Sequence, residues 1–184
     1  MAALYYLVSS LPLLTLGEKP PFSSDKYIEM CKTFLTEKQM EDLLSLNLIP
    51  NHTDSADSEV INRWYDWETC LRNSVAKIRS SVFNKDFSSF LKYENDYFSE
   101  IDKGVQEAYS ADNPLEKEDA IDKLRWTSLD NIEAKHQFDF GKLCIYKIRL
   151  MLCEKRMKRS ESKGKENLDN TLSELYSNQI NETI

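Results

Sequence analysis

Apolar residues recur at steps of three and four along most of this chain, the spacing that places them on one face of an α-helix. The longest such run predicts a helix over residues 58–83, with Trp64 and Trp67 on its buried face. Further helices are predicted over 25–35, 36–46, 86–109, from Asn113–Pro114 onward, over 139–159 and from about 168. Because no segment shows the period of two expected of a half-buried strand, the pattern predicts an all-α fold, an antiparallel helix bundle.

Polar residues mark the expected helix starts and one internal boundary. Ser24 is the expected cap of helix 25–35, Thr36 with Gln39 has the spacing of a capping box, and Asn113 precedes Pro114 at a first helical position. Residues 47–58 form a polar loop. We therefore predict one helical domain over 1–184, with possible sub-bundles 1–50 and 58–184 joined by this loop.

The segment 139–159 is apolar over most of its helical circumference, apart from one basic stripe. Lys142, Arg149 and Arg156 follow one another at intervals of seven, so they fall on nearly one line of a helix, which we call the basic ridge. The default interpretation is a core helix with a solvated charged edge. The functional interpretation is that the ridge binds an acidic partner, so these three residues are the predicted partner-binding site.

Charge is distributed unevenly along the 184 residues. The formal net charge is −7, yet residues 139–165 hold nine lysines and arginines against three acids. An acidic body with one basic segment is typical of internal docking or of a polar protein partner. It argues against nucleic-acid binding, which favours a basic face and a basic domain.

The residues offer no catalytic constellation. Glu133 and His136 have the Glu-x-x-His spacing of di-iron helical bundles, but a second copy of the motif is missing. The four cysteines form no CxxC pair and lie among apolar neighbours, as small buried residues do in a reducing compartment. No glycine-rich loop is present to hold a phosphate. We expect no cofactor, no metal and no small-molecule substrate.

The apolar N-terminal stretch is a poor signal peptide and too short for a membrane span. Proline 12 interrupts it, and it contains no lysine or arginine. No other apolar run approaches membrane-spanning length. The expected location is the cytoplasm, with any membrane association made through a partner.

The run YYLVSSLP at residues 5–12 resembles the opening of a small family of bacterial proteins whose genes accompany V-type ATPase subunits. That family is similar to the C-type subunit of V/A-type ATPases, called the d-type subunit in eukaryotes. The segment VAKIR at 75–79 resembles the Ala-Arg-Leu-Arg-like helix that opens bundles in the larger family, with Lys77 in place of the first arginine. The apolar helix ending in Glu and Arg near residue 156 also fits. The resemblance favours a helix over residues 3–11, where periodicity alone does not choose between helix and strand.

The resemblance implies a mechanical role without chemistry. The C-type subunit lies between the membrane rotor ring and the central stalk and transmits torque. The predicted function is that of a non-catalytic protein similar to this subunit, peripheral to the membrane, with central-stalk and rotor-ring subunits as partners. Two alternatives stay open: a metal-binding helical-bundle enzyme that uses Glu133 and His136, and a generic helical adaptor that binds an acidic protein.

Overall fold

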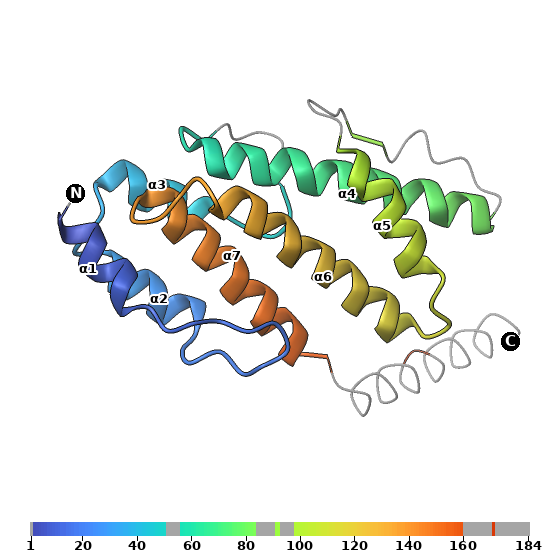
Figure 1. The fold of residues 1–184 in the computed structure, drawn as a ribbon, viewed down its shortest axis with the longest axis horizontal. Helices are drawn as coiled ribbons and strands as arrows, with labels where there is room; N and C mark the ends of the chain where they lie inside the picture. Colours follow the sequence, from blue (N-terminus) through green and yellow to red (C-terminus); the bar gives the residue numbers. More distant parts are fainter. Residues whose placement is uncertain (1, 51–55, 84–90, 93–97, 160–170, 172–184) are drawn as a thin grey trace, which may run out of the picture.

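A computed structural model describes residues 2–50, 56–83, 91–92, 98–159 and 171, and all regular structure in these ranges is helical (Figure 1). The helices are α1 (Ala2–Ser10), α2 (Ser24–Cys31), α3 (Glu37–Ser45), α4 (Glu59–Phe83), α5 (Ser99–Tyr109), α6 (Pro114–Glu133) and α7 (Phe140–Met157). This arrangement confirms the prediction of an all-α helix bundle. The helix predicted from about residue 168 lies outside the described residues, apart from residue 171.

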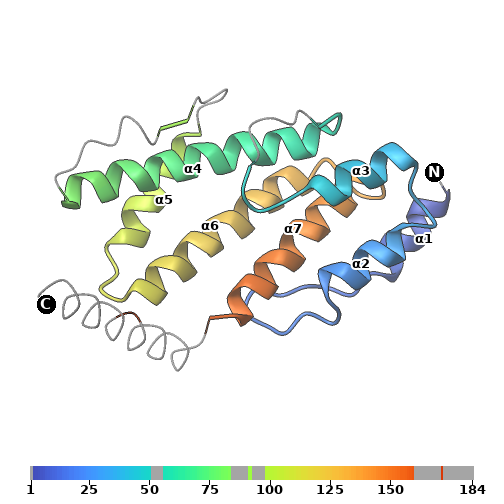
Figure 2. The same ribbon diagram turned by 180° about the vertical axis from the view of Figure 1, so that it is seen from behind.

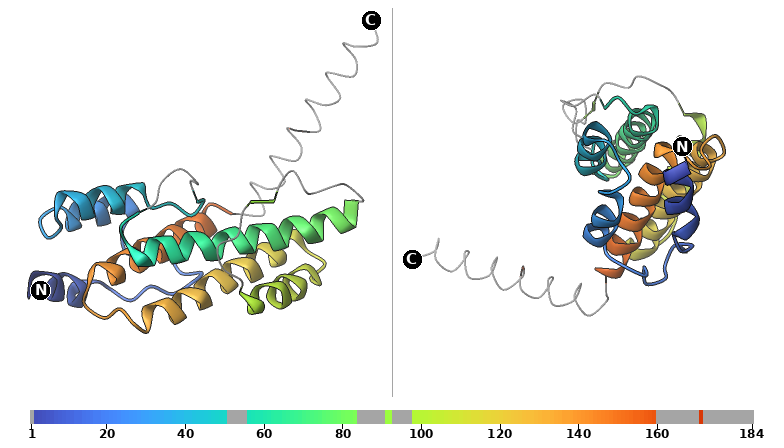
Figure 3. Two further views of the ribbon diagram at one scale, coloured as in Figure 1. Left: turned by 90° about the horizontal axis from the view of Figure 1, so that it is seen from above. Right: turned by 90° about the vertical axis from the view of Figure 1, so that its left-hand side faces the viewer.

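Helix α7 is the centre of the packing. It contacts α1, α2 and α3 on one side and α4 and α6 on the other (Figures 1 and 2). A view along the bundle shows α7 surrounded by these neighbours (Figure 3, right). Its side chains Leu143, Ile145, Ile148, Leu150 and Leu152 are completely buried. Burial of each large aliphatic side chain contributes about 1.5–3 kcal/mol to stability, so this helix supplies much of the stability of the core.

The helix starts follow the polar signals in the sequence, with one shift. Thr36 and Gln39 form the predicted capping box, and the Asn113 side chain accepts a hydrogen bond from the backbone N–H of Leu115. For α2 the cap is Ser23 and not Ser24, because the Ser23 hydroxyl accepts from the N–H of Lys26. Ser24 instead donates its N–H and its hydroxyl to the Glu154 carboxylate, each at 2.7 Å. These bonds join the start of α2 to α7.

The prediction of one helix over 86–109 is wrong at three described positions. Leu91, Lys92 and Phe98 are not helical, and α5 begins only at Ser99. The buried Asn73 of α4 supplies a physical reason. Its amide donates to the Lys92 carbonyl at 2.8 Å and accepts from the Lys92 N–H at 3.0 Å, so both backbone groups of Lys92 have partners outside a helix.

The segment between α1 and α2 lies against α7. Tyr146 donates its hydroxyl hydrogen to the Pro12 carbonyl at 3.0 Å. Gly17 has φ of +100°, in the region that favours glycine, and a Cβ added there would lie 3.3 Å from the Arg156 side chain. The connection is therefore joined to α7 by the Tyr146 hydrogen bond, and at Gly17 it passes close to the Arg156 side chain.

The predicted core is largely confirmed. Trp64 and Trp67 are buried, with stacked rings 5.9 Å apart, as expected for core residues. All four cysteines are free and buried. Leu115 of α6 is 43% exposed, since it lies in the first turn, at the end of the helix. None of the described helices is both long and apolar enough to cross a bilayer. The division into sub-bundles stays a prediction.

Candidate functional site

The basic ridge of α7 faces α6, where every one of its three residues meets a carboxylate. Lys142 pairs with Glu133, and Arg149 lies 2.7 Å from Glu133. Further along, Arg156 lies 2.9 Å from Asp119. In these pairs the residue number on α6 falls as the residue number on α7 rises, as expected of antiparallel helices. The ridge therefore joins two helices of the same chain.

The side chains of the ridge are less exposed than expected of a stripe that faces water. The Lys142, Arg149 and Arg156 side chains are 28%, 13% and 33% exposed. Arg149 also lies over the Trp126 ring, with its guanidinium carbon 5.1 Å from the ring centroid. This geometry is the internal docking that the uneven charge suggested. The partner-binding role of the three residues stays a prediction.

A second, deeper group of charges joins α4, α6 and α7. Arg125 of α6 donates to both oxygens of Glu68, at 2.8 and 2.9 Å, and to Asp122 at 2.8 Å. Glu68 and Asp122 are completely buried and Arg125 is 8% exposed. We call these three residues the buried ion cluster. Because a carboxylate without a partner is costly in the interior, the cluster depends on the guanidinium between its two acids.

Two cations, one in the last turn of α7 and one just after that helix, also contact this cluster. Lys155 Nζ lies 2.8 Å from Asp122 Oδ1, and an Arg159 guanidinium nitrogen lies 2.7 Å from Oδ2, at an angle outside hydrogen-bond geometry. Burial alone would raise the pKa of Asp122, but the cations Lys155, Arg125 and Arg159 outweigh it and leave the pKa below its ordinary value. Asp122 therefore stabilises the fold at neutral pH, and this contribution is lost as the pH falls through its lowered pKa.

Reversing Arg149 and Arg156 to Glu together is expected to lower the free energy of unfolding by about 1–3 kcal/mol, more than the small effect predicted for a solvated ridge. Each new carboxylate would face the acids of α6 at the positions where the guanidinium groups now bind them. Urea denaturation followed by circular dichroism measures the change. The control is Lys158→Glu at the exposed C-cap of α7, for which we expect at most a few tenths of a kcal/mol. Equal stability of both variants would contradict the internal role of the ridge.

Sequence reasoning missed Lys147, a buried lysine 4% exposed. Its ammonium donates to the carbonyls of Leu43, Leu44 and Leu46, the last at 2.8 Å, at the C-terminal end of α3. Burial lowers the pKa of Lys147 to about 8. Three carbonyls match its three N–H donors, and the negative end of the helix dipole favours a cation there. The signal was in the sequence, because the residues three and four positions away on either side are all apolar.

The candidate metal ligands Glu133 and His136 have other partners. Glu133 binds Lys142 and Arg149, and His136 Nδ1 lies 2.6 Å from Asp139 Oδ2. Among the described residues no group of three or more His, Cys, Asp and Glu side chains is arranged to hold a metal ion. His52 lies outside the described residues. The geometry gives the metal-enzyme interpretation no support.

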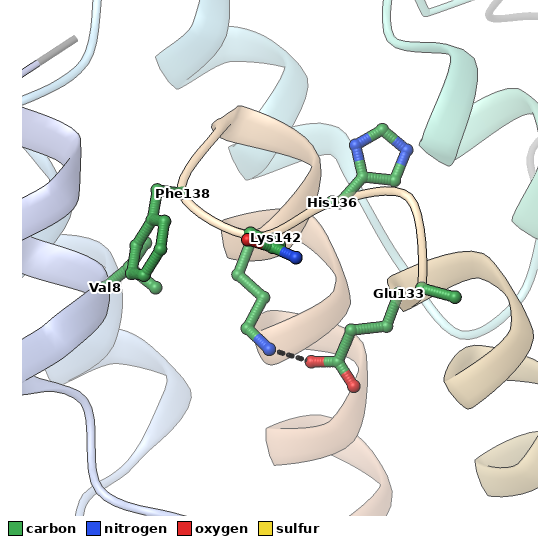
Figure 4. Close-up of a pocket in the computed structure, with 7 residues that line it drawn as sticks. Val8, Glu133, His136, Phe138 and Lys142 are labelled. Carbon is green, nitrogen blue, oxygen red and sulfur yellow. Dashed lines mark hydrogen bonds and ion pairs between the residues drawn. The ribbon is translucent and has the colours of Figure 1, made fainter.

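A shallow pocket of about 390 Å³ lies where the turn between α6 and α7 approaches α1. Figure 4 shows Phe138 next to Val8 on the side of α1, and Lys142 reaching Glu133. Next to the pocket, the Phe138 ring contacts that of Tyr5 with centroids 4.6 Å apart, and Tyr6 contacts Tyr5 at 5.9 Å. Sequence reasoning used Tyr5 and Tyr6 only as part of a resemblance and did not assign them to a surface.

Three comparisons bear on what this chain is similar to. No protein-family model matches it, no curated protein matches it, and no solved structure matches it. The chain's own residues and geometry are thus the basis for any function assigned to it.

Proposed function

We propose that this chain is a non-catalytic protein similar to the C-type subunit of V-type ATPases, a peripheral structural and coupling component between the central stalk and the membrane rotor ring. The link to the ATPase rests on the run at residues 5–12 and on the segment at 75–79. The mechanical part of the proposal is carried by one observation, the buried ion cluster, which joins α4 to α6 and, through Lys155, to α7.

The geometry of the cluster supports a mechanical role. Glu68, Arg125 and Asp122 connect α4 and α6 by hydrogen bonds between charged groups, which are directional and roughly twice as strong as neutral ones. Lys155 adds α7 to the same group. Sliding any of the three helices past the others would separate buried charges, so the body resists deformation along its length. A protein that couples a stalk to a rotor requires such resistance.

Affinity purification from the native organism tests the proposal. A chain tagged at its C-terminus, isolated in mild detergent, should bring down central-stalk and rotor-ring subunits of the V-type ATPase in constant ratio. The control is the same purification from the untagged strain. Deleting the gene should also reduce ATP-driven ion pumping more than ATP hydrolysis, because a coupling component transmits force and does not hydrolyse ATP. Consistent absence of ATPase subunits from the tagged preparation would reject the proposal.

A further inference from the structure

Lys147 holds the end of α3 through an ammonium group that is buried among neutral atoms. Its Nζ donates to the carbonyls of Leu43, Leu44 and Leu46. No carboxylate within the described residues pairs with this ammonium, whereas the buried cation Arg125 binds two carboxylates. A buried cation without an anion is stabilised only by the dipoles around it. It therefore gives up its proton more readily than a lysine in water.

The titratable groups around Lys147 keep their protons at pH 7. Cys31 of α2 and Cys144 of α7 act on the lysine, and Tyr27 of α2 interacts with both thiols. Burial raises the pKa of all three groups, to about 12 for Cys144. On α3, Asp42 acts on the Cys144 thiol but forms no ion pair with the lysine in the described part of the chain. As the pH rises above neutrality, Lys147 is therefore the first of these buried groups to change its charge.

The end of α3 has few other anchors. Of the nine residues of α3, Leu43 alone is buried, and Leu46 just after the helix also lies in the core. The Asn47 carbonyl accepts from the Trp64 indole N–H at 3.3 Å, and the Asn47 N–H donates to the Tyr65 hydroxyl at 3.2 Å, both long hydrogen bonds to α4. Segments with few buried apolar side chains and with hydrogen bonds near water open locally while the rest of a fold stays intact. The end of α3 therefore has the features of a segment that opens locally.

We propose that residues 43–47 at the end of α3 open from α7 as a local unit, and that this opening exposes Lys147 to water, where it binds a proton more strongly. Opening separates the lysine nitrogen from its three carbonyls, and water then solvates both. Because the open form holds the proton more strongly than the closed form, lowering the pH from the alkaline range favours opening. The inference does not depend on the proposed function, since it rests on contacts within this chain.

The size of the effect follows from the pKa of Lys147 in the two forms. This pKa is about 8 in the closed form and takes its ordinary value of 10.5 when the side chain is exposed. Between these values the open form binds more protons. Lys147 should therefore lower the equilibrium constant for opening about tenfold as the pH rises from 7 to 9. Below pH 7 the lysine is charged in both forms, so its effect on opening levels off.

Hydrogen–deuterium exchange of the full-length chain, measured by mass spectrometry between pH 7 and pH 9, tests the proposal. Exchange rates of amides 43–47, corrected for the intrinsic rate at each pH, give the equilibrium constant for opening when each peptide shows a single isotope envelope. We expect these amides to open more often than the core of α7, and to open less often as the pH rises. The control is α5, which packs on α4 and α6. Its local opening leaves Lys147 buried and should change by less than about twofold over this pH range.

Lys147→Met is the matched variant, since it removes the proton-binding group and leaves both thiols in place. The ratio of the opening constants of wild type and variant should fall about tenfold from pH 7 to pH 9. If the variant does not fold, the comparison of amides 43–47 with α5 in the wild type decides. Amides 43–47 as protected as the core of α7 would show that this end opens only when the whole chain unfolds, and would overturn the proposal. A pH dependence that matches α5, or that persists in Lys147→Met, would also overturn it.

Discussion

Replacing Arg125 by Met is expected to lower the free energy of unfolding by about 3–5 kcal/mol. Methionine roughly matches the aliphatic part of the arginine side chain and has good helix propensity, so the change removes chiefly the guanidinium group. Glu68 and Asp122 would then lie in the interior without the cation that now donates to both of them. Urea denaturation at neutral pH, followed by circular dichroism, measures the loss.

A neighbouring arginine provides the control for this variant. Arg72 also donates to Glu68, at 2.9 Å, but its side chain is 45% exposed. Arg72→Met should therefore cost at most about 1 kcal/mol, as do most ion pairs in contact with water. Replacing Glu68 and Arg125 together by Leu should recover part of the loss, since Asp122 keeps Lys155 and Arg159. Similar values for Arg125→Met and Arg72→Met would contradict the role given to the buried ion cluster.

The second large effect is expected for Lys147→Met, which should cost about 2–3 kcal/mol at pH 7. The lysine ammonium is the hydrogen-bond donor to three carbonyls at the end of α3, and methionine has no donor to replace it. The same denaturation experiment measures the loss. The control is Lys158→Met, at the exposed C-cap of α7, the helix that contains Lys147. Its free energy of unfolding should lie within about 0.5 kcal/mol of the wild type. A Lys147 variant as stable as the wild type would show that water satisfies these carbonyls.

The same residue should produce a distinct pH dependence. The pKa of Lys147 is about 8 in the fold, below its ordinary value of 10.5, so between these values the unfolded chain binds more protons. Lys147 therefore contributes a gain in stability as the pH rises from about 8 to 10.5. Burial raises the pKa of Tyr27, Cys31 and Cys144, and these groups oppose the gain. The measurement is the difference in pH slope between wild type and Lys147→Met, and identical slopes would contradict the lowered pKa.

Most of the fold could be predicted because its signals are local. The apolar steps along α4, the capping box of Thr36 and Gln39, and the Asn113–Pro114 start all lie within one or a few helical turns. The break before α5 was missed because it depends on Asn73, which is far from Lys92 in sequence. A side chain that hydrogen-bonds backbone groups far away in the sequence produces no periodic pattern from which the break could be predicted.

The candidate site was less predictable for the same reason. The spacing of Lys142, Arg149 and Arg156 showed correctly that they share one line of α7, but not that α6 lies against that line. The default interpretation of the ridge was a solvated charged edge, although Asp119 of α6 binds Arg156. Whether a charged stripe meets water or an opposite stripe is decided by how the helices pack, and this information is distributed over the whole chain.

The pairing of α6 with α7 also fixes how far one helix is advanced along the other. The cations of the basic ridge are evenly spaced, seven residues apart, whereas the carboxylates that meet them, Asp119, Asp130 and Glu133, are unevenly spaced. In the observed alignment each cation of the even series meets a carboxylate of the uneven series. A slip by one turn, about 5.4 Å, would separate the ion pairs that now form. Alternative alignments of these two helices are therefore penalised, and the chain is selected for a single arrangement as it folds.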